Sequence, residues 1–201
     1  QMGHAVPFAT QTPFYALLEF ESAAEAELDK AMALFEQTVE QGWVLDGVLS
    51  QSLSQAEALW KLREDISETL WHWQPYKNDI SVLVSRMPDF LREVDELVDK
   101  SYPDFELVWY GHIGDGNLHL NILKPKALSN KDFVARCVPV SKEIGQLLAK
   151  YEGSVSAEHG VGLLKKDYLH YSRSPLELEL MKQIKKVFDP NAILNPGKLF
   201  D

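Results

Sequence analysis

The stretch that decides the fold is residues 110–121, Tyr110-Gly111-His112-Ile113-Gly114-Asp115-Gly116-Asn117-Leu118-His119-Leu120-Asn121. Asp115-Gly116 favours a two-residue type I′ turn, because both central positions need a positive φ that Gly adopts freely and Asp better than most residues. We therefore expect a β-hairpin. In the register that this turn sets, His112 lies directly opposite His119, with Cβ atoms about 4.5–5.5 Å apart.

Apolar periodicity on either side of the hairpin predicts an alternation of strands and helices. The expected strands are residues 14–20, 44–49, 77–84, 105–112 and 118–123, and the expected helices are about 23–40, 54–70, 87–100, 131–151 and 175–188. This order predicts an α+β fold in which helices cover a mainly antiparallel sheet. The simplest version is ferredoxin-like, followed by a C-terminal helical segment.

Composition narrows the class of protein. The chain has 201 residues with 20 Lys and Arg against 30 Asp and Glu, a formal net charge of −10. Such acidity argues against nucleic-acid binding, which rests largely on basic side chains that neutralise phosphates. The lone Cys137 excludes an internal disulfide, and no apolar run approaches the length of a membrane span. We expect a soluble cytoplasmic protein, or a mitochondrial-matrix one in a eukaryote.

The two histidines of the hairpin predict a metal site. Alternation places Asn121 on the same face as the pair and turns Leu118 and Leu120 to the other face. Two imidazoles at this separation can chelate Zn²⁺, which needs further nitrogen or carboxylate ligands. The alternative is that one histidine satisfies a buried hydrogen bond while the other is exposed.

A glycine-punctuated loop supplies a second candidate group. Residues 156–162, SAEHGVG, place Glu158 beside His159. Glu158 can complete the metal shell, and His159 remains as an acid or base near physiological pH. The alternative is a loop that enters a helix and carries exposed charges.

Two basic residues could bind a carboxylate substrate. Arg63 offers paired hydrogen bonds and Lys77 a point charge. Taken singly, each is more often a solvated surface charge.

Six motifs, in family order, resemble the C-terminal domain of FAD-linked oxidases, the family of D-lactate, glycolate and D-2-hydroxyglutarate dehydrogenases. They are FYALLEFES (14–22), LWKLRED (59–65), KNDISVLV (77–84), YGHIGDGNLHLNIL (110–123), SAEHGVGLLKKDYL (156–169) and FDPNAILNPGKLF (188–200). The resemblance covers nearly the whole chain. It implies a substrate-and-cap domain over residues 1–201 that sits over a flavin held by a separate FAD-binding domain.

The resemblance also implies roles for single residues. His112, His119 and Glu158 match positions that bind a divalent metal, usually zinc. His159 matches the base, and Arg63, Lys77 and Asn121 match substrate contacts. Ser67 stands where a substrate-contacting threonine is common, and Asn195 of the NPGK segment is a candidate flavin contact.

We expect the chain to be a fragment, because no glycine-rich phosphate cradle for FAD is present in it. The implied parent enzyme oxidises a D-2-hydroxy acid to the 2-oxo acid by hydride transfer to FAD, with metal-assisted deprotonation. Its partners would be the 2-hydroxy acid, the missing FAD-binding domain and an electron acceptor. The acceptor would be an electron-transfer flavoprotein, a quinone or a cytochrome. A homodimer is a further expectation.

Two other classes of function stay open at the level of sequence. A stand-alone metal-binding or ligand-sensing module would bind metal or an acid without redox activity. A metal-dependent hydrolase would use the same two histidines and glutamate around an activated water. Neither accounts for the C-terminal segment and the Arg63 and Lys77 positions together.

Overall fold

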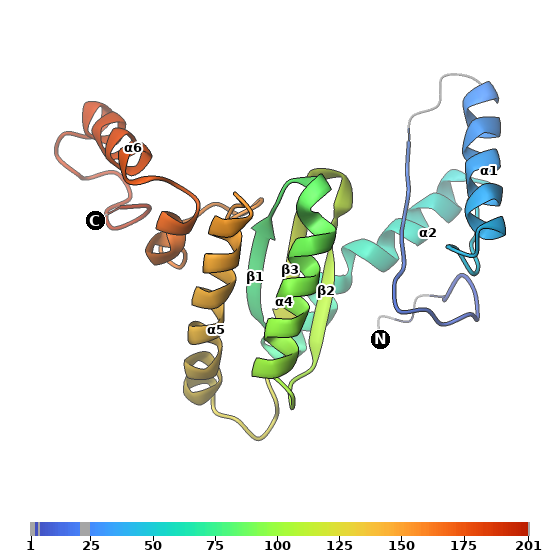
Figure 1. Cartoon of the computed structure of the whole chain (residues 1–201), viewed down its shortest axis with the longest axis horizontal. Coiled ribbons are helices and arrows are strands. Elements are labelled where there is room, and N and C mark those ends of the chain that lie inside the picture. The colour runs from blue at the N-terminus through green and yellow to red at the C-terminus, as the bar shows by residue number, and fades with distance from the viewer. Residues whose placement is uncertain (1–2, 4, 21–24, 201) are drawn as a thin grey trace. The chain divides into compact units, whose positions relative to one another are not determined.

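The structure is a computed structural model that describes residue 3, residues 5–20 and residues 25–200. These residues divide into two compact units, residues 1–72 and residues 73–201. Figure 1 shows the first unit as helices with extended connections and the second as a sheet with helices. None of the helices within residues 25–200 combines the length and the apolar character that crossing a membrane requires.

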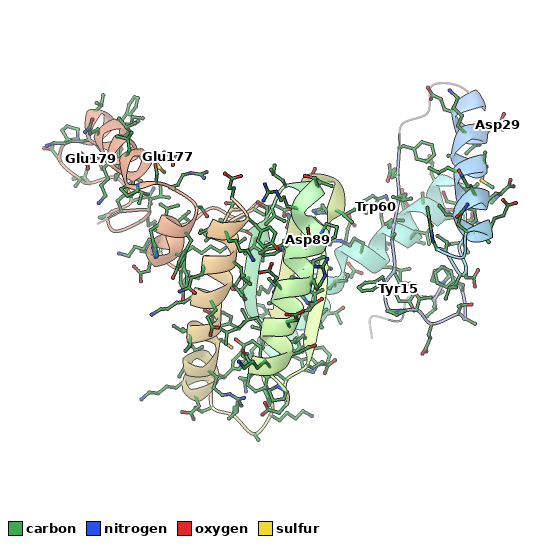
Figure 2. The ribbon with its side chains drawn as sticks, viewed as in Figure 1. Tyr15, Asp29, Trp60, Asp89, Glu177 and Glu179 are labelled. Atoms are coloured by element: carbon green, nitrogen blue, oxygen red, sulfur yellow. The ribbon has the colours of Figure 1, made fainter. Side chains whose placement is uncertain are left out.

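The first unit is helical. Its helices are α1 (Glu25–Glu40), α2 (Leu53–Glu64) and α3 (Ile66–Leu70), and the 3₁₀ helix η1 (Trp71–Trp73) leads into the second unit. The Ser52 hydroxyl caps α2 by accepting a hydrogen bond from the Gln55 backbone N–H. Figure 2 labels Trp60, whose indole N–H donates to Glu19 within this unit. The expected helix 54–70 is thus confirmed but divides at Asp65, and residues 23–24 of the other expected helix lie outside the described residues.

Two expected strands of the first unit are wrong. Residues 14–20 and 44–49 are extended, but within the described part of the chain neither pairs with a neighbouring strand. β-Propensity reflects how well a side chain fits a pleated, half-buried surface, so it acts only where a second strand supplies that surface. Phe14 and Leu45 here keep 88% and 67% of their surface exposed.

The second unit carries the sheet. Its strands are β1 (Tyr76–Ser81), β2 (Leu107–His112) and β3 (Asn117–Ile122), all antiparallel in the order β1-β3-β2. Its α-helices are α4 (Met87–Ser101), α5 (Asn130–Lys150) and α6 (Pro175–Phe188), and its short 3₁₀ helices are η2 (Val84–Arg86), η3 (Ile113–Asp115) and η4 (Lys166–Tyr171).

The ferredoxin-like expectation is confirmed in this unit. Its elements run strand, helix, strand, strand, helix, as in the split βαβ arrangement. After α5, where a further strand would follow, the chain makes one antiparallel bridge from Ser154 to Ser81 of β1. The chain after α5 is therefore fixed beside the sheet edge and does not extend into a full strand.

α4 and α5 cover one face of the sheet and form the core with it (Figure 1). Leu118, Leu120 and Ile122 of β3 point into this core, beside Phe90 of α4 and Ile144 of α5. The Ser174 hydroxyl and the Glu177 side chain form a capping box at the start of α6, where Figure 2 labels Glu177. The opposite face of β3 is also buried, but its side chains are polar.

Candidate functional site

The polar face of the sheet collects the predicted residues of the second unit. Because side chains alternate along a strand, one face receives Lys77 and Asp79 from β1, Tyr110 and His112 from β2, and Asn117, His119 and Asn121 from β3. Asp79 lies opposite His119, and Lys77 lies opposite Asn121. The sequence therefore assigned the histidines and Asn121 to the correct shared face.

The predicted register of the hairpin is wrong by two residues. His112 pairs with Asn117, and His119 pairs with Tyr110, so the two histidines lie diagonally and not directly opposite each other. Of the two expected turn residues, Asp115 and Gly116, only Gly116 has a positive φ, 69°, and the connection is a 3₁₀ turn over Ile113–Asp115, so the type I′ turn does not form. A shift of two residues keeps every side chain on its face, and the two imidazole centroids are 6.4 Å apart.

Gly116 also fixes this turn against the end of β1. Its carbonyl accepts a hydrogen bond from the Val82 backbone N–H at 3.0 Å. A Cβ atom at Gly116 would lie 1.9 Å from the Val82 carbonyl oxygen, whereas a Cβ at Gly114 would meet nothing within 4 Å. The hairpin can therefore approach β1 only with glycine at position 116.

Gly116→Ala should lower the free energy of unfolding by about 1–3 kcal/mol, through a strained positive φ and overpacking. Gly114→Ala in the same turn is the matched control and should change it by less than about 0.5 kcal/mol. Urea denaturation of both variants measures the difference. Equal stability of the two variants would contradict this account of the turn.

The loop after α5 brings the third candidate ligand over the polar face. A Glu158 carboxylate oxygen lies 2.9 Å from His112 Nδ1, and the other lies 3.8 Å from His119 Nε2. Asn117 donates from its side-chain amide to the same Glu158 carboxylate. One ligand atom from each of His112, His119 and Glu158 falls within 4.8 Å of the others. The predicted triad therefore comes together.

His159 lies on the same side of the sheet as the triad. Its imidazole centroid is 6.0 Å from that of His119, which also stacks on Tyr110 at 4.8 Å. Asp79, His119 and His159 form a second group whose ligand atoms lie within 4.8 Å of one another. His119 is common to both groups, so one imidazole connects Glu158 on one side with Asp79 on the other.

Asp79 and Lys165 are two of the site residues that sequence reasoning missed. The Asp79 carboxylate accepts hydrogen bonds from the backbone N–H of Glu158 and of His159, both at 3.3 Å, and from Lys165 Nζ at 3.2 Å. The signal available in the sequence was the position of Asp79, two residues after Lys77 in the same strand. This spacing places both side chains on the face of the histidines.

Asp79 is buried and forms an ion pair with the half-buried Lys165. Burial acts to raise the pKa of Asp79, but the Lys165 ammonium and the backbone N–H groups of His159 and Glu158 outweigh it and hold that pKa below its ordinary value. Burial lowers the pKa of Lys165, and its attraction to Asp79 offsets only part of this effect. Asp79 is therefore an anion with its countercharge already in place.

Three buried side-chain oxygens on this face accept no hydrogen bond from the residues that the structure describes: Asp79 Oδ1, Asn117 Oδ1 and Asn121 Oδ1. Buried polar atoms normally have partners, and such exceptions gather where a ligand, ion or water binds. Imidazole nitrogens with a carboxylate oxygen are the donor set that Zn²⁺ prefers. The residues present therefore fit a divalent metal.

The predicted substrate residues lie in both units. Lys77 is exposed on β1, and Asn121, opposite it, is 1% exposed and donates toward the His119 carbonyl at 3.5 Å. Arg63 is half-buried in the last turn of α2, and Ser67 is exposed on α3. The structure brings Lys77 and Asn121 together within the second unit, and the roles of Arg63 and Ser67 stay predictions.

Asn195 lies in an ordered tail. Its φ is 46°, its backbone carbonyl accepts from the Lys198 N–H at 3.3 Å, and Leu199 N–H donates to the Gly162 carbonyl at 3.1 Å. The tail is thus connected to the glycine-rich loop that carries Glu158 and His159. The flavin contact of Asn195 stays a prediction.

Asp189 anchors this tail to the end of α6. Its carboxylate accepts from Lys185 Nζ at 2.9 Å and from the backbone N–H of Ile193 and Leu194 at 2.9 and 3.0 Å. The hydrogen bond from Lys185 is the main cause that lowers the pKa of Asp189, and the two backbone donors add to it against the effect of burial.

Asp189→Asn should speed hydrogen exchange at the Ile193 and Leu194 amides at neutral pH, because it removes a charge-assisted acceptor. The folded pKa lies below the unfolded one, so this protection is present above the unfolded pKa and is lost as pH falls through the folded pKa. Over that acidic range, the protection of the two amides in the wild type should fall to that in Asp189→Asn. Protection of these two amides in the variant equal to that of the wild type at neutral pH would contradict the anchor.

The chain belongs to the family described as FAD linked oxidases, C-terminal domain, whose model matches residues 1–199. It is 62% identical over 194 residues to a D-2-hydroxyglutarate dehydrogenase of Stutzerimonas stutzeri, with 96% of this chain and 42% of that protein covered. It is 55% identical over 199 residues to a D-2-hydroxyglutarate dehydrogenase of Xanthomonas citri pv. viticola, with 99% and 42% covered. A probable mitochondrial D-2-hydroxyglutarate dehydrogenase of Oryza sativa subsp. indica is 42% identical over 189 residues, with 92% and 32% covered.

The chain thus spans about two fifths of the length of the first two of these relatives. The family resemblance drawn from the six motifs is confirmed.

Proposed function

We propose that this chain is the substrate-and-cap domain of an FAD-dependent D-2-hydroxy-acid dehydrogenase of the D-2-hydroxyglutarate class. The observation that carries the proposal is the meeting of His112, His119 and Glu158 on the buried polar face, in a chain of the FAD-linked oxidase family. The names of its relatives favour D-2-hydroxyglutarate over D-lactate or glycolate. FAD would be held mainly by a separate FAD-binding domain of the whole protein.

His112, His119 and Glu158 would hold a divalent metal, with zinc the first choice for this donor set. Bound there, the metal would supply a Lewis acid that lowers the pKa of a substrate hydroxyl. Asn117 keeps the Glu158 carboxylate oriented by its hydrogen bond. Tyr110 fixes the His119 ring by stacking on it.

His159 is the proposed base. The substrate hydroxyl gives its proton to the His159 imidazole as the hydrogen on C2 leaves with its electron pair, and the 2-oxo acid results. FAD supplies the hydride acceptor when bound. The backbone N–H of His159 donates to Asp79, so the residue is fixed while its ring remains available for proton transfer.

Arg63 and Lys77 are the proposed carboxylate-binding residues, and Ser67 and Asn121 the proposed neutral hydrogen-bonding ones. Each offers a positive charge to a substrate carboxylate, Arg63 through paired hydrogen bonds and Lys77 as a point charge.

Electrons would leave FAD for an electron-transfer flavoprotein, a quinone or a cytochrome, and a homodimer is proposed as the assembly. We propose that the protein lies in the cytoplasm of a bacterium, or in the mitochondrial matrix if its source is eukaryotic. Eukaryotic relatives are named as mitochondrial proteins.

The experiment that tests the proposal uses the full-length protein with its flavin. D-2-hydroxyglutarate, D-lactate, glycolate and D-malate are titrated in turn while the flavin absorbance is recorded. We expect D-2-hydroxyglutarate to bleach the flavin at the lowest concentration, and a chelator to abolish the bleaching until zinc is restored. Bleaching that a chelator leaves intact would refute the metal role, and no bleaching by any of the four acids would refute the enzyme class.

A further inference from the structure

The two overlapping ligand groups around His119 raise the question of what Asp79 does. We propose that Asp79 is the positioning residue of this centre: it directs the His119 ring from the Nδ1 side and fixes the backbone that carries Glu158 and His159, while Lys165 neutralises its charge. The inference rests on the metal site of the proposed function and adds to it a residue that acts through others.

The electrostatics of Asp79 make it a poor metal ligand. Lys165 Nζ lies 3.2 Å from its Oδ2 and 3.0 Å from its backbone carbonyl oxygen. A divalent cation bound by this carboxylate would be repelled by the half-buried Lys165 ammonium at short range. Glu158 has a side chain that is 41% exposed and accepts from His112 and Asn117. The group of His112, His119 and Glu158 is therefore the ligand set, and Asp79 lies outside it.

The two nitrogens of His119 face different carboxylates. Nε2 lies 3.8 Å from Glu158, and Nδ1 lies 3.6 Å from Asp79 Oδ1. A metal bound at Nε2 requires the proton on Nδ1, and a carboxylate at Nδ1 favours that tautomer and makes the imidazole a stronger donor. Asp79 Oδ1 is buried and accepts no hydrogen bond from the described residues, so it is placed to accept a hydrogen bond from His119 Nδ1–H.

The other oxygen of Asp79 fixes the loop. Oδ2 accepts from two successive backbone N–H groups, those of Glu158 and His159. Ser156 adds its hydroxyl, 3.5 Å from the same oxygen. Asp79 thus orients the His119 ring through Oδ1. Through Oδ2 it fixes the backbone of Glu158 and His159.

Asp79→Asn in the full-length protein tests this inference. The variant keeps the size of the side chain and one oxygen for the loop, but its amide can donate to Nδ1 and so favours the opposite tautomer of His119. We expect zinc affinity, measured by competition with a chromophoric chelator, to fall about 10–100-fold, as for other partners of ligating histidines. The ¹⁵N spectrum of the metal-free, histidine-labelled protein should move from Nδ1–H to Nε2–H at His119.

Asp189→Asn is the matched control. Asp189 is likewise buried and bonded to one lysine and two backbone N–H groups, but it anchors the C-terminal tail. We expect its substitution to leave zinc affinity and the His119 tautomer unchanged. A fall in zinc affinity equal to that of Asp79→Asn would mean that general loosening, and not positioning, is the cause.

The spectrum of the metal-free wild type tests the proposal even if Asp79→Asn does not fold. The His119 signals, assigned from their loss in His119→Gln, should show Nδ1–H at mildly alkaline pH, where histidine is neutral. An Nε2–H signal would overturn the positioning role. Failure of the wild type to bind zinc would instead overturn the proposed metal centre, and the tautomer measurement distinguishes the two because it needs no metal.

Discussion

His119→Ala should lower zinc affinity by more than about 100-fold. Loss of a residue that hydrogen-bonds to a metal ligand costs about 10–100-fold, and loss of the ligand itself should cost more. His119 is the imidazole shared by both ligand groups and lies at the centre of β3, with only 11% of its side chain exposed. Its removal takes away one of the proposed nitrogen ligands and leaves Glu158 without one of its two histidine neighbours. Zinc content after dialysis, and affinity by chelator competition in the full-length protein, measure the effect.

The control for this substitution is His170→Ala, which removes an exposed histidine of η4 in the same unit. It should bind zinc as the wild type does. Because the polar face of β3 is buried, the folding of His119→Ala has to be measured as well. His112→Ala tests the same triad at a half-buried position, where the substitution does not alter this buried face. Retention of wild-type zinc affinity in both triad variants would exclude this triad as the metal site.

His159→Ala should lower kcat of the full-length enzyme about 10²–10⁴-fold, the range for loss of a general base, and change KM much less. In the proposed mechanism His159 acts only when the hydroxyl proton leaves, so its loss is felt in the transition state and little in substrate binding. Steady-state kinetics with D-2-hydroxyglutarate and a dye acceptor give both constants. Zinc affinity should stay close to that of the wild type, because the proposed ligand set does not include His159.

Added imidazole offers a sharper test of the same role. If His159 is the base, imidazole in solution should restore part of the lost kcat of His159→Ala without changing its zinc affinity. Loss that appears in KM alone would instead make His159 a substrate-binding residue. Unchanged kinetics would remove it from the mechanism.

The faces of the hairpin could be predicted from the sequence because side-chain alternation is a local property of each strand. His112, His119 and Asn121 were assigned to one face and Leu118 and Leu120 to the other, as the structure has them. The register could not be predicted, since the turn signal of Asp115-Gly116 is local. The hydrogen bond from Val82 to Gly116, which joins β1 to the turn, is a tertiary contact.

Tertiary contacts also explain the other differences. Residues 14–20 and 44–49 have the composition of strands, but composition does not say whether a partner strand is present. Asp79 resembles a surface charge in the sequence, and its burial depends on a loop whose Ser156 lies 77 positions further along the chain. The sequence could therefore predict which residue types gather at the candidate site, but not the burial of Asp79 beneath the loop.

The two faces of β3 have a consequence for altering this protein by design. Residues 118, 120 and 122 point into the core, whereas residues 117, 119 and 121 line the polar site. One strand of six residues therefore carries two separate sets of positions, interleaved one by one. A library that varies Asn121 and leaves its even-numbered neighbours fixed should change substrate preference while retaining the core packing. An insertion or deletion of a single residue in this strand would exchange the two sets and should abolish folding and metal binding together.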